Sequence, residues 1–206
     1  VSLINIQLLF ILLLVLNFFI IDEFKKLFNA IFSKNHFFYF ISLLSMLVYN
    51  VFFTLILLNY LSQSFSVNKF TVFFLLSIII ATDVGGYIFG KVFGGKKLTK
   101  ISPKKTFSGM IGGYLMSITL IYFFYYYSYL IFDVFEDFNN KTLLFVFLVS
   151  SISQIGDIII SFFKRLSKVK DTGKIIPGHG GILDRIDGMI FAFPFSYIIL
   201  SLDFLK

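Results

Sequence analysis

Long apolar runs dominate this chain and restrict the folds open to it. Six of them approach membrane length, at about 2–21, 37–60, 70–90, 107–132, 142–163 and 186–203. A helix needs roughly 20 mostly apolar residues to cross a bilayer. None of the runs alternates with a strict period of two residues, so helices are favoured over a transmembrane barrel. We therefore expect an all-α, polytopic integral membrane protein with about six transmembrane helices, forming a single membrane domain over 1–206.

The composition supports this class and excludes several kinds of site. Hydrophobic residues make up 58% of the 206 residues and charged residues only 14%, against about 45–50% and about 25% in soluble domains. The chain has no cysteine, which excludes disulfides, thiolate metal sites and a cysteine nucleophile. Its two histidines, His36 and His179, are far apart in the sequence, so a zinc site is disfavoured.

The basic residues predict the orientation in the membrane. Three segments, 22–36, 91–106 and 164–185, hold 15 of the 18 Lys and Arg residues. Because positive charge collects in cytoplasmic loops, we expect these three segments, including the Gly/Lys-rich loops at 91–106 and 164–185, to face the cytoplasm and both chain ends to face outward. The prediction is a multi-pass protein of the cell (inner) membrane with a cytoplasmic active site. The net charge of +7 suits an anionic lipid surface or phosphates and gives no reason to invoke nucleic acid.

Two aspartates lie inside apolar runs. Asp83 and Asp157 are each surrounded by apolar and small residues, where a charged side chain costs about 2.5–3.5 kcal/mol on insertion scales. A simpler interpretation is a protonated Asp bonded to a neighbouring Ser or Gln. Helical spacing puts Asp157 on one face with Ser161, Lys164 and Arg165, so this face carries an acid in the membrane and cations at its cytoplasmic end.

A second acidic pair, Asp184 and Asp187, stands three residues apart before the last run. Acids there are also explained by capping and by the helix dipole. Together with Asp157 they could instead hold a divalent cation, because Mg²⁺ takes one or two carboxylates plus phosphate oxygens and waters.

Glycines and lysines are interleaved in "DVGGYIFGKVFGGKKLTKISPKKTFSGMIGG", a composition that suits anion binding. The stretch "GKVFGGKK" is not a P-loop, because Lys97 replaces the final Ser/Thr and an apolar span precedes it. Gly109, Gly112 and Gly113 are equally consistent with close helix contacts. In "PGHGG", His179 could polarise a phosphate or shape the loop. The absence of a G-x-S-x-G elbow disfavours an esterase.

The stretch "SFFKRLSKVKDTGKIIPGHGGILDRID" at 161–187 resembles the signature of phosphatidate cytidylyltransferases, also called CDP-diacylglycerol synthases. Residues at matching spacings are Ser161, Lys164, Arg165, Lys170, Asp171, Gly173, Pro177, His179, Gly180, Gly181, Asp184, Arg185 and Asp187. "TDVGGYIFG", "SPKKTFSGMIGG" and "QIGD" are similar to further family segments, so the likeness covers about 70–203. We divide the chain into N-terminal spans at 1–69 and a catalytic region at 70–206.

The chain departs from the family pattern in two ways. Ser108 stands where the family commonly has Glu, so an acid role at that position is absent or moved. Family members are usually longer, with extra N-terminal spans. That difference, and a first residue Val1 rather than Met, leaves open a truncated N-terminus, a reduced variant or a catalytically dead remnant.

The resemblance implies a reaction of CTP with phosphatidate that yields CDP-diacylglycerol and pyrophosphate. It implies Mg²⁺ on Asp157 and Asp184, with a second cation as an option and with Asp187 and Asp83 as weaker candidates. We expect Asp157, Asp184, Asp187, Lys164 and Arg165 to be catalytic. The substrate-binding residues expected are Ser161, Lys170, Asp171, His179, Gly180, Gly181, Arg185, Lys104 and Lys105.

The expected partners are CTP, phosphatidate and the lipid bilayer, with a homodimer as a further option. Two other functions stay open at this point. A CTP-dependent lipid kinase would transfer the γ-phosphoryl group to a lipid alcohol and release CDP. A cation or proton transporter would use Asp83 and Asp157 as a relay.

Overall fold

The structure is a computed structural model that describes residues 3–62, 68–132, 138–175, 178 and 180–202. Within these residues the chain forms helices and no strand, which confirms the all-α class. The helices are α1 (Leu3–Ile31), α2 (His36–Ser62), α3 (Asn68–Phe93), α4 (Phe107–Phe132), α5 (Asn140–Leu166), α6 (Leu183–Ile186) and α7 (Met189–Ser201).

Each of the six apolar runs is found as a helix. Among the described residues four helices are long and apolar enough to cross a membrane, namely α2, α3, α4 and α5, whereas α7 is a shorter apolar helix. α1 continues ten residues beyond the end of its apolar run at about residue 21, reaching Ile31. This continuation contains the charged residues Asp22, Glu23, Lys25 and Lys26. Glu and Lys end the apolar run but favour helix, so the helix continues through them.

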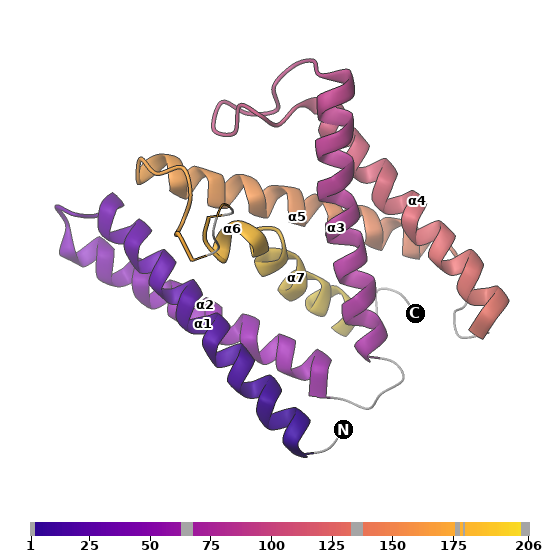
Figure 1. Cartoon of the computed structure of the whole chain (residues 1–206), viewed down its shortest axis with the longest axis horizontal. Coiled ribbons are helices and arrows are strands. Elements are labelled where there is room, and N and C mark those ends of the chain that lie inside the picture. Colours follow the sequence, from indigo (N-terminus) through magenta and orange to yellow (C-terminus); the bar gives the residue numbers. More distant parts are fainter. Residues whose placement is uncertain (1–2, 63–67, 133–137, 176–177, 179, 203–206) are drawn as a thin grey trace.

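The helices form two pairs with a layer between them (Figure 1). α1 contacts α2 and α3 contacts α4, while α5 and α7 lie between these two pairs. The helix ends next to the basic segments 22–36, 91–106 and 164–185 lie toward the upper left of Figure 1, and the opposite helix ends lie toward the lower right. The segments expected to share one side of the membrane therefore do lie on one side of the bundle.

Glycines allow α3 and α4 to pack closely. A Cβ at Gly109 would lie 2.6 Å from the carbonyl oxygen of Gly86, and a Cβ at Gly112 would collide with the ring of Phe89. A Cβ at Gly113 would lie 2.9 Å from the Thr82 carbonyl oxygen. Of the two interpretations of these glycines, the structure supports close helix contacts.

Many large apolar side chains on the outside of the bundle are exposed. Phe18, Phe37 and Tyr87 are 67–69% exposed, and similar side chains lie along α2 and α4. A soluble monomer rarely leaves so many large apolar groups in water. This surface is suited to lipid chains.

Candidate active site

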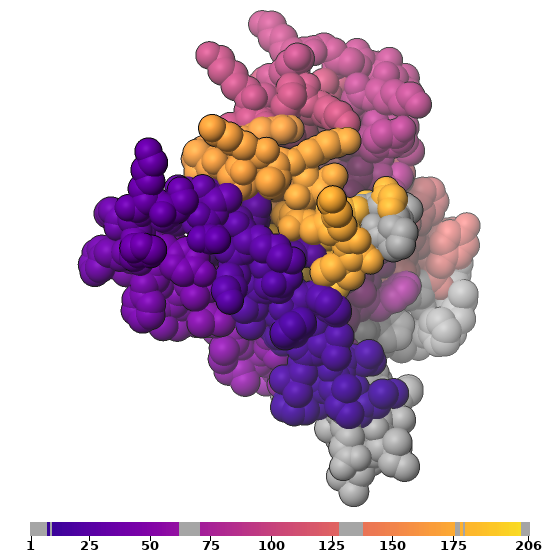
Figure 2. Space-filling model, turned by 60° about the vertical axis from the view of Figure 1, so that its left-hand side comes forward, coloured from indigo at the N-terminus to yellow at the C-terminus, as the bar shows by residue number. Residues whose placement is uncertain are grey.

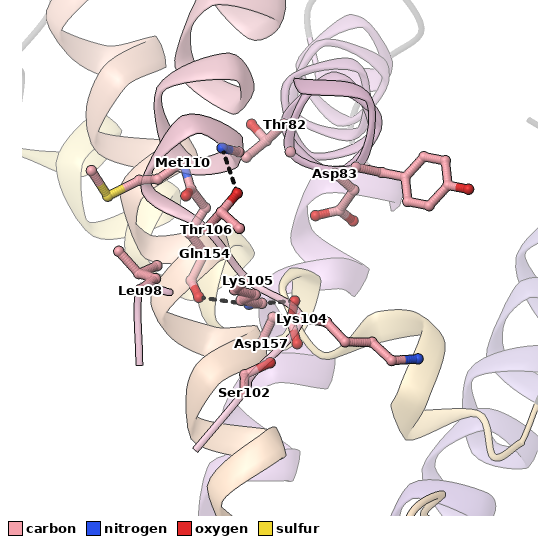
Figure 3. A pocket seen from close by; sticks show the side chains of 13 residues that line it. Thr82, Asp83, Leu98, Ser102, Lys104, Lys105, Thr106, Met110, Gln154 and Asp157 are labelled. Carbon is pink, nitrogen blue, oxygen red and sulfur yellow. Dashed lines mark hydrogen bonds and ion pairs between the residues drawn. The ribbon is translucent and has the colours of Figure 1, made fainter. Parts of the chain in front are cut away.

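A cavity of about 330 Å³ opens between α3, α4, α5 and the segment 94–106. Its lining includes Asp83 on α3, Gln154 and Asp157 on α5, and Lys104 and Lys105 from the segment. Small-molecule sites typically measure about 300–1,000 Å³. The cavity brings together three distant parts of the chain and places acids and lysines around one space (Figure 3).

Asp157 has both of its carboxylate oxygens engaged. Lys105 Nζ lies 2.5 Å from Asp157 Oδ2, and these two side chains are 24% and 30% exposed. The same ammonium group donates to the Gln154 carbonyl oxygen at 3.4 Å (Figure 3). One turn further along α5, Ser161 Oγ donates to Asp157 Oδ1 at 3.4 Å, which confirms that these two residues share a helix face. Lys104, by contrast, extends away from this pair (Figure 3).

Two further acids lie close to Asp157. The Asp83 carboxylate points into the same space (Figure 3) and is close enough to repel Asp157 electrostatically. The Asp187 carboxyl group is also close enough to Asp157 for the two acids to repel each other electrostatically, so three acids from α3, α5 and the start of the last apolar run lie near one another.

Asp184 is held by a different set of partners. Lys164 Nζ lies 2.7 Å from Asp184 Oδ1 in an ion pair whose side chains are 16% and 8% exposed. Asp184 Oδ2 accepts from the backbone N–H groups of Thr172 at 2.8 Å and Gly181 at 2.9 Å, and the Thr172 hydroxyl oxygen lies 3.1 Å from it. Burial raises the pKa of Asp184, but the hydrogen bonds from Lys164 and the two backbone groups outweigh it and lower the pKa below its usual value.

The remaining basic residues of the signature reach outward from this centre. Arg165 Nε donates to the Ile101 carbonyl oxygen at 3.3 Å, which ties the end of α5 to the segment 94–106. Lys170 and Asp171 are exposed and line a second cavity of about 590 Å³ beside α1. Arg185 lies in the last turn of α6. Their substrate-binding roles stay predictions.

The glycines of the signature pack against carboxylates. Gly180 has φ of 85°, and a Cβ there would lie 2.7 Å from Asp184 Oδ2. A Cβ at Gly181 would collide with the Thr172 hydroxyl and with a carboxylate from α1. That Gly180 and Gly181 bind substrate stays a prediction. His179, predicted to touch a phosphate or shape the loop, lies outside the described residues.

Comparison with known sequences decides the family. A sequence model of the Cytidylyltransferase family matches residues 2–203. The chain belongs to the cytidylyltransferase family.

Several relatives of this cytidylyltransferase-family chain have curated names. A phosphatidate cytidylyltransferase of Staphylococcus saprophyticus is 39% identical over 145 residues, covering 68% of this chain and 53% of the relative. Another, from Rickettsia bellii, is 40% identical over 152 residues, covering 71% of this chain and 64% of the relative. One from Bacillus subtilis is 39% identical over 132 residues, covering 64% of this chain and 47% of the relative. The chain thus spans about half to two thirds of the length of these relatives.

Two residues of the site were missed in the sequence. Glu23 on α1 is fully buried, and Thr172 in the loop after α5 donates its hydroxyl group to Glu23 at 2.6 Å. Glu23 follows an apolar run and stands beside the charged residue Asp22, so it resembles an ordinary charge at a membrane surface. The one available signal was that this carboxylate comes directly after a predicted span.

The acids of this cytidylyltransferase-family site can supply some of the ligands of a divalent cation but not all of them. In the part of the chain that the structure describes, no three His, Cys, Asp or Glu side chains are grouped closely enough to ligate one ion. Mg²⁺ does not need three protein ligands, since one or two carboxylates plus substrate phosphates suffice. Asp83, Asp157 and Asp187 lie close together while one lysine, Lys105, is paired with Asp157, so a cation would offset the remaining repulsion among these acids. The predicted Asp157–Asp184 pair stays a prediction.

Proposed function

We propose that this chain carries the activity of a phosphatidate cytidylyltransferase, joining CTP to phosphatidate to give CDP-diacylglycerol and pyrophosphate. The observation that carries the proposal is the Lys105–Asp157 ion pair at a cavity beside the basic segments, with the acids Asp83 and Asp187 close to Asp157. Paired acids and lysines at one cavity suit a reaction between two phosphates. The family match and the names of the relatives support the same assignment.

The reaction requires little covalent chemistry from the protein. A phosphate oxygen of phosphatidate attacks the α-phosphorus of CTP and forms a new P–O bond. The bond from the α-phosphorus to the oxygen that bridges it to the β-phosphorus breaks, and pyrophosphate leaves with the bonding electrons. Because the nucleophile is already an anion, no strong general base is needed. Positioning and charge neutralisation are the main requirements.

Lysines and arginines close to the cavity would supply part of that neutralisation. Lys105 already contacts Asp157, so it is placed to exchange that carboxylate for a phosphate oxygen. Lys104 extends away from the pair (Figure 3), so it would meet a different part of a substrate. Lys164 is committed to Asp184 and acts mainly by holding that residue in place. We assign Arg165, Lys170 and Arg185 to the outer phosphates and the lipid headgroup.

The proposed cofactor is Mg²⁺, with a second cation as an option. Asp157 would hold it with Asp187, since these two carboxyl groups lie close enough to interact electrostatically. Asp184, the second ligand expected from the sequence, would first have to release some of its donors at Oδ1 or Oδ2. When bound, Mg²⁺ would neutralise the phosphate oxygens that the lysines do not reach.

The proposed location is the cell (inner) membrane, with the site facing the cytoplasm. The three basic segments lie on one side of the bundle (Figure 1). Residues of one of them, Lys104 and Lys105, line the cavity, which suits the side where CTP is available. Phosphatidate would reach the site from the bilayer along the exposed apolar surface. A homodimer stays a prediction.

The test uses the full chain in detergent with phosphatidate and CTP labelled at either the α- or the γ-phosphate. The proposal predicts that α-label enters the lipid, that γ-label leaves as pyrophosphate, and that EDTA stops both. Transfer of γ-label to a lipid would instead indicate a CTP-dependent kinase. Absence of both transfers, from protein that is folded by size-exclusion chromatography, would overturn the proposal.

A further inference from the structure

Glu23 is a fully buried carboxylate that lies far in sequence from every residue it binds. Its Oε1 accepts from the backbone N–H of Ile182 at 2.8 Å, and its Oε2 accepts from the backbone N–H of Leu183 at 2.9 Å. The Thr172 hydroxyl adds a third donor at 2.6 Å to Oε2. A buried charge is costly unless donors satisfy it. Here three donors from the signature loop do so.

Thr172 links Glu23 to Asp184. Its hydroxyl lies 2.6 Å from Glu23 Oε2 and 3.1 Å from Asp184 Oδ2, and its backbone N–H donates to the same Asp184 oxygen at 2.8 Å. Asp184 in turn pairs with Lys164 on α5. A continuous set of polar contacts therefore runs from α1 through the loop to α5.

The two loop glycines next to Glu23 are shaped to its carboxylate. A Cβ at Gly173 would lie 2.7 Å from Glu23 Oε1, and a Cβ at Gly181 would lie 2.5 Å from the same atom. Side chains at these positions would push the loop away from α1. Figure 2 shows the same region from outside, with the orange segment that follows α5 lying against the indigo helix α1.

We propose that Glu23 is a positioning residue that holds the loop bearing Asp184 and Asp187 in its working shape. It touches no reacting atom. It fixes the backbone at Ile182 and Leu183, directly before Asp184, and through Thr172 it fixes the carboxylate of Asp184 itself. The first helix thus takes part in the active site, although the family signature lies wholly between residues 161 and 187. This inference rests on the proposed function.

The charge of Glu23 matters as well as its shape. A carboxylate offers two oxygen acceptors, whereas a glutamine amide offers one oxygen and one NH₂ group. Either orientation of the amide would therefore set an N–H against a donor from Thr172, Ile182 or Leu183. Glu23→Gln, which is nearly isosteric, should loosen the loop without leaving a cavity.

The matched control is the neighbouring acid on the same helix. Asp22 is 37% exposed and pairs with Lys26, one turn away. Asp22→Asn makes the same change of charge one residue away, and among the described residues its hydrogen bond and ion pair go to Lys26 and not to the loop. A second variant, Thr172→Val, removes only the hydroxyl group that joins Glu23 to Asp184.

Two measurements on the full chain in detergent test the proposal. The first is steady-state kinetics: Glu23→Gln should lower kcat about tenfold or more, the effect expected when a hydrogen bond to a charged group is lost, with a smaller change in KM for CTP. The second is amide hydrogen exchange without substrate. Exchange at Gly181–Asp184 should speed up in Glu23→Gln, while α5 stays protected and Asp22→Asn matches the wild type. Thr172→Val should show the same changes to a smaller degree, and adding it to Glu23→Gln should cost little more.

The outcomes separate this inference from the proposed function. If the wild type forms no nucleotide-lipid product, the function fails, while the exchange data still report on the Glu23 contacts. Unchanged kcat and unchanged exchange in Glu23→Gln would overturn the inference, and so would loss of protection throughout α5, because Glu23 would then act on the fold as a whole. Should Glu23→Gln not fold, Thr172→Val decides by the same criteria.

Discussion

The buried ion pair between Lys164 and Asp184 offers a quantitative test of the site. The two groups are 2.7 Å apart and only 16% and 8% exposed. Removing one partner of a buried pair typically costs about 3–5 kcal/mol, because the other charge stays buried without compensation. For a chain of this size 1 kcal/mol corresponds to about 2–4 °C in Tm. Loss of the ion pair alone should therefore lower Tm by about 6–20 °C.

The two single variants should differ in a defined order. Asp184→Ala also leaves the backbone N–H groups of Thr172 and Gly181 without an acceptor, which adds about 1–3 kcal/mol for each that stays buried. Lys164→Met leaves Asp184 with these hydrogen bonds, so it should cost less. The double variant should cost clearly less than the sum of the two.

The assay is thermal unfolding of the purified chain in detergent, followed by the loss of the monodisperse peak in size-exclusion chromatography. Lys168→Met, an exposed lysine on the same segment, serves as the control and should leave Tm unchanged. Additive effects in the double variant, or shifts below about 2 °C for both single variants, would refute the assignment of a buried, coupled pair.

Three further predictions concern the contact between α3 and α4, the proposed cation and the pH dependence of stability. Gly112→Ala should lower Tm by the equivalent of about 1–3 kcal/mol, because the new methyl group collides with Phe89; Gly86→Ala, whose nearest neighbour would be 3.7 Å away, should be close to neutral. Adding Mg²⁺ at 100 times its Kd should stabilise the wild type by about 2.7 kcal/mol and raise its Tm. Asp157→Asn should abolish this rise in Tm at matched ionic strength. If the rise persists in the variant, Asp157 is not a ligand of the metal. The pKa of Asp184 is lowered in the folded protein, so its ionised form stabilises the fold above the ordinary carboxyl pKa of about 3.9, and this stabilisation is lost as pH falls through the lowered pKa. The difference in Tm between the wild type and Asp184→Asn should therefore narrow below about pH 4. A constant difference down to pH 2 would contradict the assignment.

Features that depend on neighbours along the chain could be predicted from the sequence. A membrane-length apolar run must be helical to satisfy its backbone, so all six runs became helices. Asp157 and Ser161 share a face because they are four residues apart in one helix. Gly109 and Gly112 could be recognised as sites of close helix contact, although the sequence alone did not decide between that and an anion-binding role.

Features that depend on packing between distant segments could not be predicted. The contact of Lys105 with Asp157 joins a loop to the middle of a helix 52 residues later, and no periodicity encodes it. Asp184 looked free to bind a metal because nothing in its local sequence shows that Lys164, Thr172 and Gly181 converge on its two oxygens. Glu23 was overlooked because a charge just past an apolar run is common at membrane surfaces.

The tie between α1 and the signature loop also constrains how the protein is made. Glu23 and Ile182 are 159 residues apart, and ribosomes add about 5–20 residues per second. After Glu23 emerges, about 10–30 s therefore pass before its backbone partners are synthesised. A chain synthesised only as far as α5 has helices in the bilayer but no means of shaping its reactive centre, so maturation waits until the loop before α7 has been made.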